Sequence, residues 1–334
     1  HSSNASPERK ETTAMPPHNR IGLCLALALA AAAPWNAGAE APRDDVYIDD
    51  KPDPLSPLMI RERIETEYNN IFIVQKGDFL SMTFRLKGEN TRQSVLNLRD
   101  RGQLPLPHSH YQTLAAVHAG KLNSMLMVGL GGGSVPDYFL RHVPETAVTS
   151  VELDPGVVRA AQKYFGVGES SRHRIATGDG RVFLMRNKAK YDIVMIDAFR
   201  GGYVPFHLLT HEFYTLLAQR LEPDGVAVLN LRAGTQLFDS SMATLKRTFK
   251  TIEVYEWSGN AIVLARLLPP MTQDERRARA EARQAQYKFR YNIVALLKDE
   301  AKIEAKEARL LTDDFAPVNL YDSIESRKRN GGAQ

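Results

Sequence analysis

The sequence predicts an α/β protein in which a doubly wound, Rossmann-like sheet closed by an antiparallel hairpin follows a small antiparallel β-domain. Three observations lead to this prediction. Short apolar runs alternate with helical stretches from residue 125 onward, which is the pattern of a parallel sheet with crossover helices. A glycine-rich loop follows the first of these runs. The last two runs, 252–257 and 261–265, are separated only by Ser258-Gly259-Asn260, a hairpin turn.

Length and composition are those of a globular protein. The 334 residues suffice for one large domain and a smaller one. The formal net charge is +4, but 43 Lys and Arg stand against 39 Asp and Glu. Basic residues form no stripe with interleaved aromatic residues, so we expect no nucleic-acid partner.

The N-terminal 39 residues are expected to be a targeting segment. Residues 1–14 are interpreted as a vector-derived remnant or a misassigned start, with Met15 as the natural start. His18 and Arg20, an apolar run over 21–33 and small residues up to Ala39 predict a cleavable signal peptide rather than a buried helix. We therefore expect export to the periplasm and no membrane span in the mature chain. A cytoplasmic location follows if this interpretation is wrong.

Cysteine chemistry is excluded if that segment is removed. Cys24 is the only cysteine and lies inside the apolar run. The mature chain would then have no disulfide and no cysteine-based nucleophile or metal ligand.

The region 40–103 is predicted to comprise a linker and the small β-domain. Residues 40–58 are rich in Pro and Asp, as extended linkers are. In the domain at 59–103, strands are expected at 71–74, at 79–86 and in a segment that ends near Leu98. So small a sheet does not fold well alone, and we expect it to pack on the next domain.

The larger domain is expected at 104–268, followed by a charged helical segment at 269–334. Its predicted strands are 125–128, 148–153, 174–177, 191–196, 226–231, 252–257 and 261–265. Its predicted helices are 110–119, 134–141, 155–165, the stretch after 180, 211–221 and 240–249, with a further charged helix over 272–310. Pro155 and Thr210 are good helix starts.

The glycine loop is the first candidate for ligand binding. Gly129, Gly131 and Gly133 lack a Cβ atom, so the backbone can turn tightly and approach a ligand. The helix that follows would present its N-terminus to that ligand. This pattern serves many nucleotides and does not by itself identify one.

Three acidic residues lie at or just beyond the carboxyl ends of predicted strands, on the ligand-binding edge of the sheet. Glu152 lies about twenty residues beyond the loop, where an acidic side chain can hold both ribose hydroxyls; the alternative is an exposed strand-end carboxylate. Asp179 could accept a hydrogen bond from an adenine amino group, and could also cap the following helix. Asp197 lies at the crevice and has either a functional or a structural role.

Six motifs occur in a fixed order along the chain: Glu67-Tyr68-Asn69-Asn70-Ile71, Tyr111-Gln112, Gly129–Ser134, Val151-Glu152-Leu153-Asp154, Gly178-Asp179-Gly180 and Asp197. Taken together, these motifs resemble the spermidine synthase (polyamine aminopropyltransferase) family, which has a class I methyltransferase fold. The resemblance covers roughly residues 60–265 and includes the small β-domain. It implies transfer of an aminopropyl group from decarboxylated S-adenosylmethionine to a diamine, without a metal.

The resemblance also implies site roles. Glu152 would hold ribose, Asp179 adenine, and Asp197 the attacking amine, with Asp197 and Tyr111 catalytic. Gln112 would help to bind the nucleoside, and Asn69 stands where the family usually has glutamine. A polyamine-like amine is the expected acceptor, and a homodimer is left open.

Two departures from the family pattern alter these expectations. Gly132 replaces an acid, and Asp197-Ala198-Phe199-Arg200 replaces Asp-Ser-Ser-Asp. The chain is therefore closer to a synthase-like branch that carries the signature Leu311-Thr312-Asp313-Asp314-Phe315-Ala316-Pro317. Because the lost acid would have rejected a carboxylate, we expect the preference to have moved towards intact S-adenosylmethionine.

Three functions remain open on the sequence alone. The first is an aminopropyltransferase, in which Asp197 deprotonates the amine and Tyr203 is a secondary candidate. The second is a methyltransferase that uses S-adenosylmethionine. The third is a non-catalytic, exported protein that binds a nucleoside or a polyamine. A nicotinamide dehydrogenase is a distant fourth, because neither the terminal hairpin nor Gly178-Asp179-Gly180 suggests it.

Overall fold

The computed structural model describes residues 55–86, 92–199, 204–303 and 307–314. All of them belong to one compact unit, Ile48–Gln334. The expected signal peptide and the side chains of Arg200 and Tyr203 lie outside the described residues, so these predictions stay open.

The larger sheet has seven strands and confirms the predicted fold class. In spatial order the strands are β10 (Thr251–Trp257), β11 (Asn260–Arg266), β9 (Leu221–Arg232), β8 (Tyr191–Ile196), β5 (Ser124–Val128), β6 (Ala147–Glu152) and β7 (His173–Thr177). The pairs from β9 to β7 are parallel, whereas β11 pairs antiparallel with both β9 and β10. The strand order reverses between β5 and β8, and ligands of such sheets bind at the carboxyl ends of these strands.

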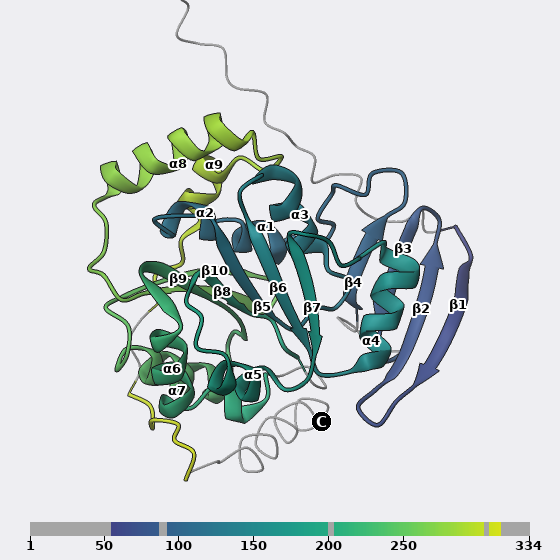
Figure 1. Cartoon of the computed structure of the whole chain (residues 1–334), viewed down its shortest axis with the longest axis horizontal. Helices are drawn as coiled ribbons and strands as arrows, with labels where there is room; N and C mark the ends of the chain where they lie inside the picture. The colour runs from purple at the N-terminus through teal and green to yellow at the C-terminus, as the bar shows by residue number, and fades with distance from the viewer. Residues whose placement is uncertain (1–54, 87–91, 200–203, 304–306, 315–334) are drawn as a thin grey trace, which may run out of the picture. The chain divides into compact units, whose positions relative to one another are not determined.

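Helices cover both faces of this sheet (Figure 1). One face packs against α2 (Ala115–His118), α3 (Ser134–His142) and α8 (Gln273–Tyr287), with α1 (His108–Gln112) at its edge. The other face packs against α5 (Gly180–Arg186), α6 (His211–Gln219) and α7 (Gln236–Leu245). The remaining helical elements are α4 (Pro155–Ala160), a π-helical turn η1 (Ala161–Phe165), η2 (Phe206–Leu208), α9 (Ile293–Leu296) and η3 (Leu297–Asp299).

The small sheet has four antiparallel strands in sequential order, one more than predicted. They are β1 (Leu58–Glu65), β2 (Asn70–Lys76), β3 (Phe79–Thr83) and β4 (Arg92–Asn97). The sequence did not reveal β1 because this edge strand is largely exposed on both faces and lacks an alternating pattern. The sheet buries Ile71 and Met82 in one cluster with Val157 and Phe165 of α4 and η1, so the expected packing on the larger domain is present.

Several predicted boundaries were wrong. The helix expected over 110–119 is two short helices, because Thr113 closes α1 and its hydroxyl bonds the His110 carbonyl. The charged helix expected up to residue 310 ends at Tyr287, where Lys288 takes the left-handed conformation at φ 49°. Strand β3 ends at Thr83 rather than 86, α6 ends at Gln219 rather than 221, α7 spans 236–245 rather than 240–249, and β9 begins at Leu221 rather than 226.

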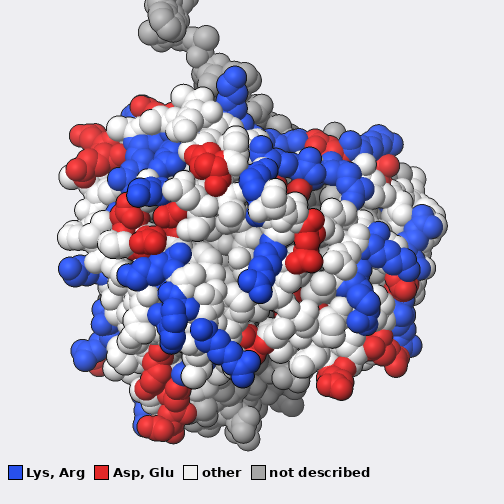
Figure 2. Space-filling view, in the orientation of Figure 1, with Lys and Arg blue, Asp and Glu red and all other residues white. Residues whose placement is uncertain are grey.

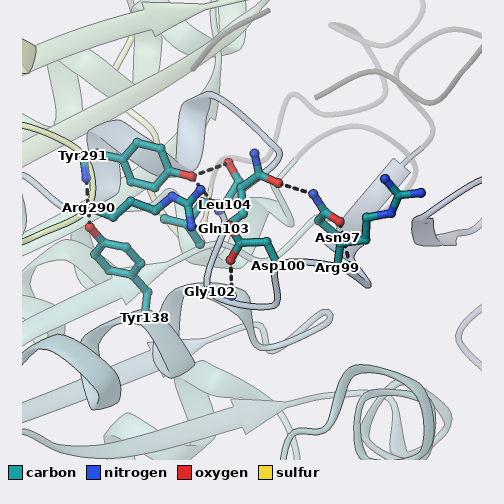
Figure 3. Close-up of polar contacts among 9 residues, drawn as sticks. All are labelled: Asn97, Arg99, Asp100, Gly102, Gln103, Leu104, Tyr138, Arg290 and Tyr291. Atoms are coloured by element: carbon teal, nitrogen blue, oxygen red, sulfur yellow. Dashed lines mark hydrogen bonds and ion pairs between the residues drawn. The ribbon is translucent and has the colours of Figure 1, made fainter. Parts of the chain in front are cut away.

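The segment after α8 fixes the connection between the two sheets (Figure 3). Arg290 forms an ion pair with Asp100 at 2.6 Å, and the Tyr291 hydroxyl accepts from the Leu104 amide at 2.7 Å. Tyr291 also stacks on His110 in α1, with ring centroids 3.7 Å apart. This connection leads directly into α1, so the C-terminal segment helps to position the side chains that α1 presents.

The surface carries both charge signs. Figure 2 shows Lys and Arg interspersed with Asp and Glu over the face that it presents. Within the described parts of the chain, no helix is both long and apolar enough to cross a membrane.

Candidate nucleoside- and amine-binding site

The glycine loop adopts a conformation that side chains disfavour. Gly129, Gly131 and Gly133 have φ values of 91°, 52° and 68°. A Cβ atom at Gly129 would lie 2.3 Å from the backbone oxygen of Asp197. The loop therefore approaches the end of β8 closely, and Gly133 directly precedes α3.

Glu152 holds the loop in place. At the carboxyl end of β6, its Oε2 accepts the Leu130 amide at 2.8 Å and its Oε1 accepts the Asp154 amide at 3.0 Å. Burial raises the pKa of Glu152, whereas these backbone amides act in the opposite direction. A carboxylate has about four acceptor positions, and the backbone amides of Leu130, Gly131 and Asp154 leave one of them, so the predicted ribose contact is compatible with this geometry.

Replacement of this carboxylate should weaken nucleoside binding. For Glu152→Ala we expect a loss of about 1.5–3 kcal/mol, since a charge-assisted contact and the anchor of the loop are removed together. Calorimetry with the thioether product of the donor measures this loss. Glu169→Ala is the matched control, because Glu169 also accepts a backbone amide, that of Ile175, but is exposed. Equal affinity of the two folded variants would remove the ribose assignment.

Asp154, two residues further on, connects the site to the small sheet. Its Oδ1 caps α4 through the Gly156 amide at 2.8 Å. Its Oδ2 accepts the Thr66 hydroxyl at 2.7 Å and the Asn69 amide group at 2.9 Å. Asn69, which stands where the family usually has glutamine, thus bonds to the residue two positions beyond Glu152.

Asp179 caps a helix, as one of the two interpretations predicted. Its Oδ1 accepts the Val182 amide at 2.9 Å, and its Oδ2 lies 2.8 Å from His207 Nε2. The hydrogen bond with His207 lowers the pKa of Asp179. A cleft of about 390 Å³ opens beside it, with Thr177, Gly178 and Phe183 among its lining residues. The predicted contact with adenine would share the carboxylate with His207.

Asp197 lies at the carboxyl end of β8 between two side-chain amides. Gln112 Nε2 in α1 donates to Oδ2 at 2.8 Å, and Asn230 Nδ2 in β9 donates to Oδ1 at 2.9 Å. The structure therefore brings Asp197 together with Gln112 and with the glycine loop. In the sequence, Gln112 lies 85 residues before Asp197, and the loop begins about 68 residues before it. Asn230 was missed, although a lone amide in the apolar run 226–231 indicates a buried polar role.

His108 is a second residue that the sequence did not reveal. It precedes Gln112 by four residues and so lies on the same face of α1. Burial lowers the pKa of His108, and the negative charge of Asp197 acts in the opposite direction. An imidazole near the Asp197 carboxylate could exchange a proton with it.

Tyr111 contacts η3 and β10. It is buried, its hydroxyl donates to Asp299 at 3.1 Å, and its ring stacks on Tyr255 with centroids 5.6 Å apart. These contacts tie α1 to η3 and β10. A catalytic role for Tyr111 stays a prediction.

Gly132 is enclosed by neighbouring side chains. A Cβ atom there would lie 2.6 Å from Phe165 Cδ1 and 2.9 Å from Ser94 Cβ. The Gly132 amide donates to Ser94 Oγ at 2.7 Å. The loss of the family's acid at this position is therefore accompanied by an aromatic ring from η1 that takes up the space of a side chain. Among the described residues, no group of three or more His, Cys, Asp or Glu is arranged to hold a metal ion.

Comparisons with known proteins show the family to which the chain is similar. The sequence profile of the spermine/spermidine synthase domain matches residues 108–258. A polyamine aminopropyltransferase of Vibrio vulnificus (strain CMCP6) is 33% identical over 282 residues, which cover 80% of this chain and 94% of that relative. A probable spermidine synthase of Corynebacterium glutamicum has the same fold, with a TM-score of 0.61 at 19% identity, over 78% of this chain and 99% of that structure.

Methyltransferases are also similar to part of the chain. The human eEF1A lysine and N-terminal methyltransferase is 30% identical over 161 residues, which are 44% of this chain but only 23% of that protein. The Vibrio relative, in contrast, is matched over almost its whole length. The chain therefore belongs to the spermine/spermidine synthase family.

Proposed function

We propose that this protein transfers an aminopropyl group from decarboxylated S-adenosylmethionine to a polyamine-like amine. The observation that carries this proposal is the Asp197 carboxylate, oriented by Gln112 and Asn230 at the reversal point of the sheet beside the glycine loop. The name of the Vibrio relative, polyamine aminopropyltransferase, supports the same activity.

The proposed mechanism is an in-line displacement. The amine lone pair attacks the methylene carbon next to the sulfonium, the carbon–sulfur bond breaks, and its electron pair neutralises the sulfur. Because the positive charge on sulfur disappears, the protein chiefly needs to position the amine and accept its proton. Asp197 would accept that proton, while the loop held by Glu152 would position the nucleoside.

The chain's residues fit a nucleoside donor. Glycines with positive φ permit close approach of the backbone, and Glu152 has acceptor capacity left for ribose hydroxyls. The residues that would bind the three-carbon end of the donor are less well defined. At Gly132, where the family has an acid, Phe165 and Ser94 enclose the space of a side chain. The preference for decarboxylated or intact S-adenosylmethionine is therefore tested together with the function.

A two-donor assay tests the function. Purified protein is incubated with each donor and with a series of diamines and polyamines, and the products are identified by mass. A gain of one aminopropyl group from the decarboxylated donor is the expected result. A methylated product formed only from S-adenosylmethionine would support the methyltransferase alternative, which the partial similarity to the human enzyme favours. Binding without any transfer would support the non-catalytic alternative.

We also propose that the chain is exported, on the basis of the basic, apolar and small-residue succession in residues 15–39. A fusion of residues 15–45 to a reporter that is active only outside the cytoplasm should give a signal, and the mature chain should begin near Glu40. Recovery of the uncleaved chain from the cytoplasmic fraction alone would contradict export.

A further inference from the structure

The C-terminal signature that begins at Leu311 contacts the larger domain, although it has no part in the proposed mechanism. Leu311 is fully buried; its amide donates to Thr244 Oγ1 at 3.0 Å, and its carbonyl accepts the His211 amide at 2.8 Å. Two residues further on, the Asp313 amide donates to Glu212 Oε2 at 3.0 Å. These contacts with α6 and α7 fix where the side chain of Asp313 lies.

The Asp313 carboxylate binds the guanidinium of Arg181. Arg181 Nη1 donates to Asp313 Oδ1 at 2.7 Å, and Arg181 Nη2 donates to Asp313 Oδ2. The same Nη1 also donates to the His207 carbonyl at 3.0 Å and to Thr210 Oγ1 at 3.3 Å. The side chain of Arg181 is only 18% exposed. Because a bidentate pair fixes the plane of the guanidinium as well as its position, Asp313 determines how Arg181 is oriented.

Arg181 is the second residue after Asp179, the proposed partner of the adenine amino group. A carboxylate has about four acceptor positions. At Asp179, the backbone amides of Arg181 and Val182 and the His207 imidazole take three of them. One position is therefore left for a ligand in the cleft that Asp179 lines.

The Arg181 guanidinium could compete for that position if Asp313 did not hold it. The hydrogen bonds with Asp313 raise the pKa of Arg181, and the charges of Glu212 and Asp179 act in the same direction. Two further carboxylates are thus close enough to attract this guanidinium. A largely buried cation that loses its carboxylate turns to another one, because an unpaired buried charge is costly.

We propose that Asp313 is a positioning residue, which keeps the Arg181 guanidinium away from Asp179 and so leaves an acceptor position for the 6-amino group of adenine. The inference rests on the proposed function, and only on its nucleoside site. It gives the C-terminal signature a part in recognition of the base. A purine with an oxygen at C6 presents an acceptor to the Asp179 carboxylate instead of a donor, so the site rejects it.

Asp313→Asn removes the charge at nearly unchanged size and tests the inference. Calorimetry compares 5′-methylthioadenosine, the thioether product of the decarboxylated donor, with 5′-methylthioinosine, which has an oxygen in place of the 6-amino group. Wild-type protein should bind the adenine compound about tenfold or more tightly, as expected for a hydrogen bond to a charged group. In Asp313→Asn this ratio should fall about fivefold or more, through weaker binding of the adenine compound. Asp313→Ser, which also lacks the charge, should behave in the same way.

Arg181→Gln distinguishes competition by the guanidinium from a general loss of structure. In that background Asp313→Asn should lower the ratio no further, because no guanidinium remains to approach Asp179. Asp78→Asn is the matched control. Asp78, in the turn between β2 and β3, pairs with Arg99 at 2.8 Å, and its side chain is 43% exposed, close to the 41% of Asp313. Its replacement should leave the ratio at the wild-type value.

Base recognition and transfer can fail separately. A folded Asp313→Asn protein with the wild-type ratio, including one that binds both nucleosides more weakly by the same factor, overturns the inference even where aminopropyl transfer is observed. Wild-type protein that binds the two nucleosides equally overturns it as well. If the ratio falls as expected but the wild-type protein transfers no aminopropyl group to any amine, the proposed function fails and the inference stands.

Discussion

Asp197→Asn should lower kcat by about 10²–10⁴-fold while leaving affinity for the thioether product unchanged. The range is that of a general base lost from its reaction. Asparagine preserves the shape of the side chain but cannot accept the amine proton. Its NH₂ group would also meet the NH₂ of Gln112 or of Asn230, so one of the two orienting hydrogen bonds is lost.

A matched control lies on the same strand. Asp192 is buried near the other end of β8, where its Oδ2 accepts the amides of Asn123 and Ser124 at 2.8 and 2.9 Å. Asp192→Asn should lower the melting temperature and leave kcat close to the wild-type value. If Asp197→Asn retained kcat within about tenfold, below the usual contribution of a base, His108 would become the better candidate for that role.

The sequence predicted those site residues that lie at the ends of strands. Glu152, Asp179 and Asp197 lie at or just beyond the carboxyl ends of predicted strands, and such ends of parallel strands meet at one edge of a sheet. The partners of Asp197 could not be deduced in the same way, because His108 depends on the exact phase of a five-residue helix. Asn230 depends on the register between β8 and β9, in which Leu229 lies opposite Ile196, the residue before Asp197.

Elements that are stabilised by distant contacts were the least predictable. Strand β1 carries no periodic pattern because only its pairing with β2 defines it. The segment after Tyr287 has a helical composition, but Arg290 and Tyr291 are drawn into contacts with Asp100, Leu104 and His110. There, tertiary contacts override helix propensity.

The replacement of the family's acid by Gly132 affects the packing of neighbouring residues as well as the charge of the loop. From the sequence, the change from the family's acid to glycine is a loss of charge, and restoring the acid should simply move donor preference back. In the structure, the π-helical turn η1 ends at Phe165, whose ring lies where a side chain at position 132 would begin. Ser94, on β4 of the small sheet, closes the other side and binds the Gly132 amide. Charge and packing have changed together here.

Gly132→Asp alone should therefore destabilise the protein, by about 3 kcal/mol or more in the free energy of unfolding. Overpacking of a buried position costs about 1–3 kcal/mol, and burial of a carboxylate against an aromatic ring adds to this. Denaturant unfolding measures the change. Gly168→Asp is the matched control, because a Cβ atom at Gly168 has no neighbour within 4 Å; it should be nearly neutral. Equal stability of the two variants would contradict the packing argument.

The donor question is then answered by a second substitution that makes room for the acid. In Gly132→Asp/Phe165→Ala the ring that lies closest to the position is removed, and the new carboxylate can turn towards the donor once Ser94, whose Cβ would lie 2.9 Å from the new Cβ, shifts slightly. Relative to Phe165→Ala alone, we expect the affinity ratio to move towards decarboxylated S-adenosylmethionine by about 1–3 kcal/mol, the range for a hydrogen bond to a charged group. Calorimetry with both donors measures that ratio. An unchanged ratio in the folded double variant would mean that position 132 does not face the end of the donor at which the two compounds differ. The acid missing from this loop would then have no bearing on which donor the protein uses.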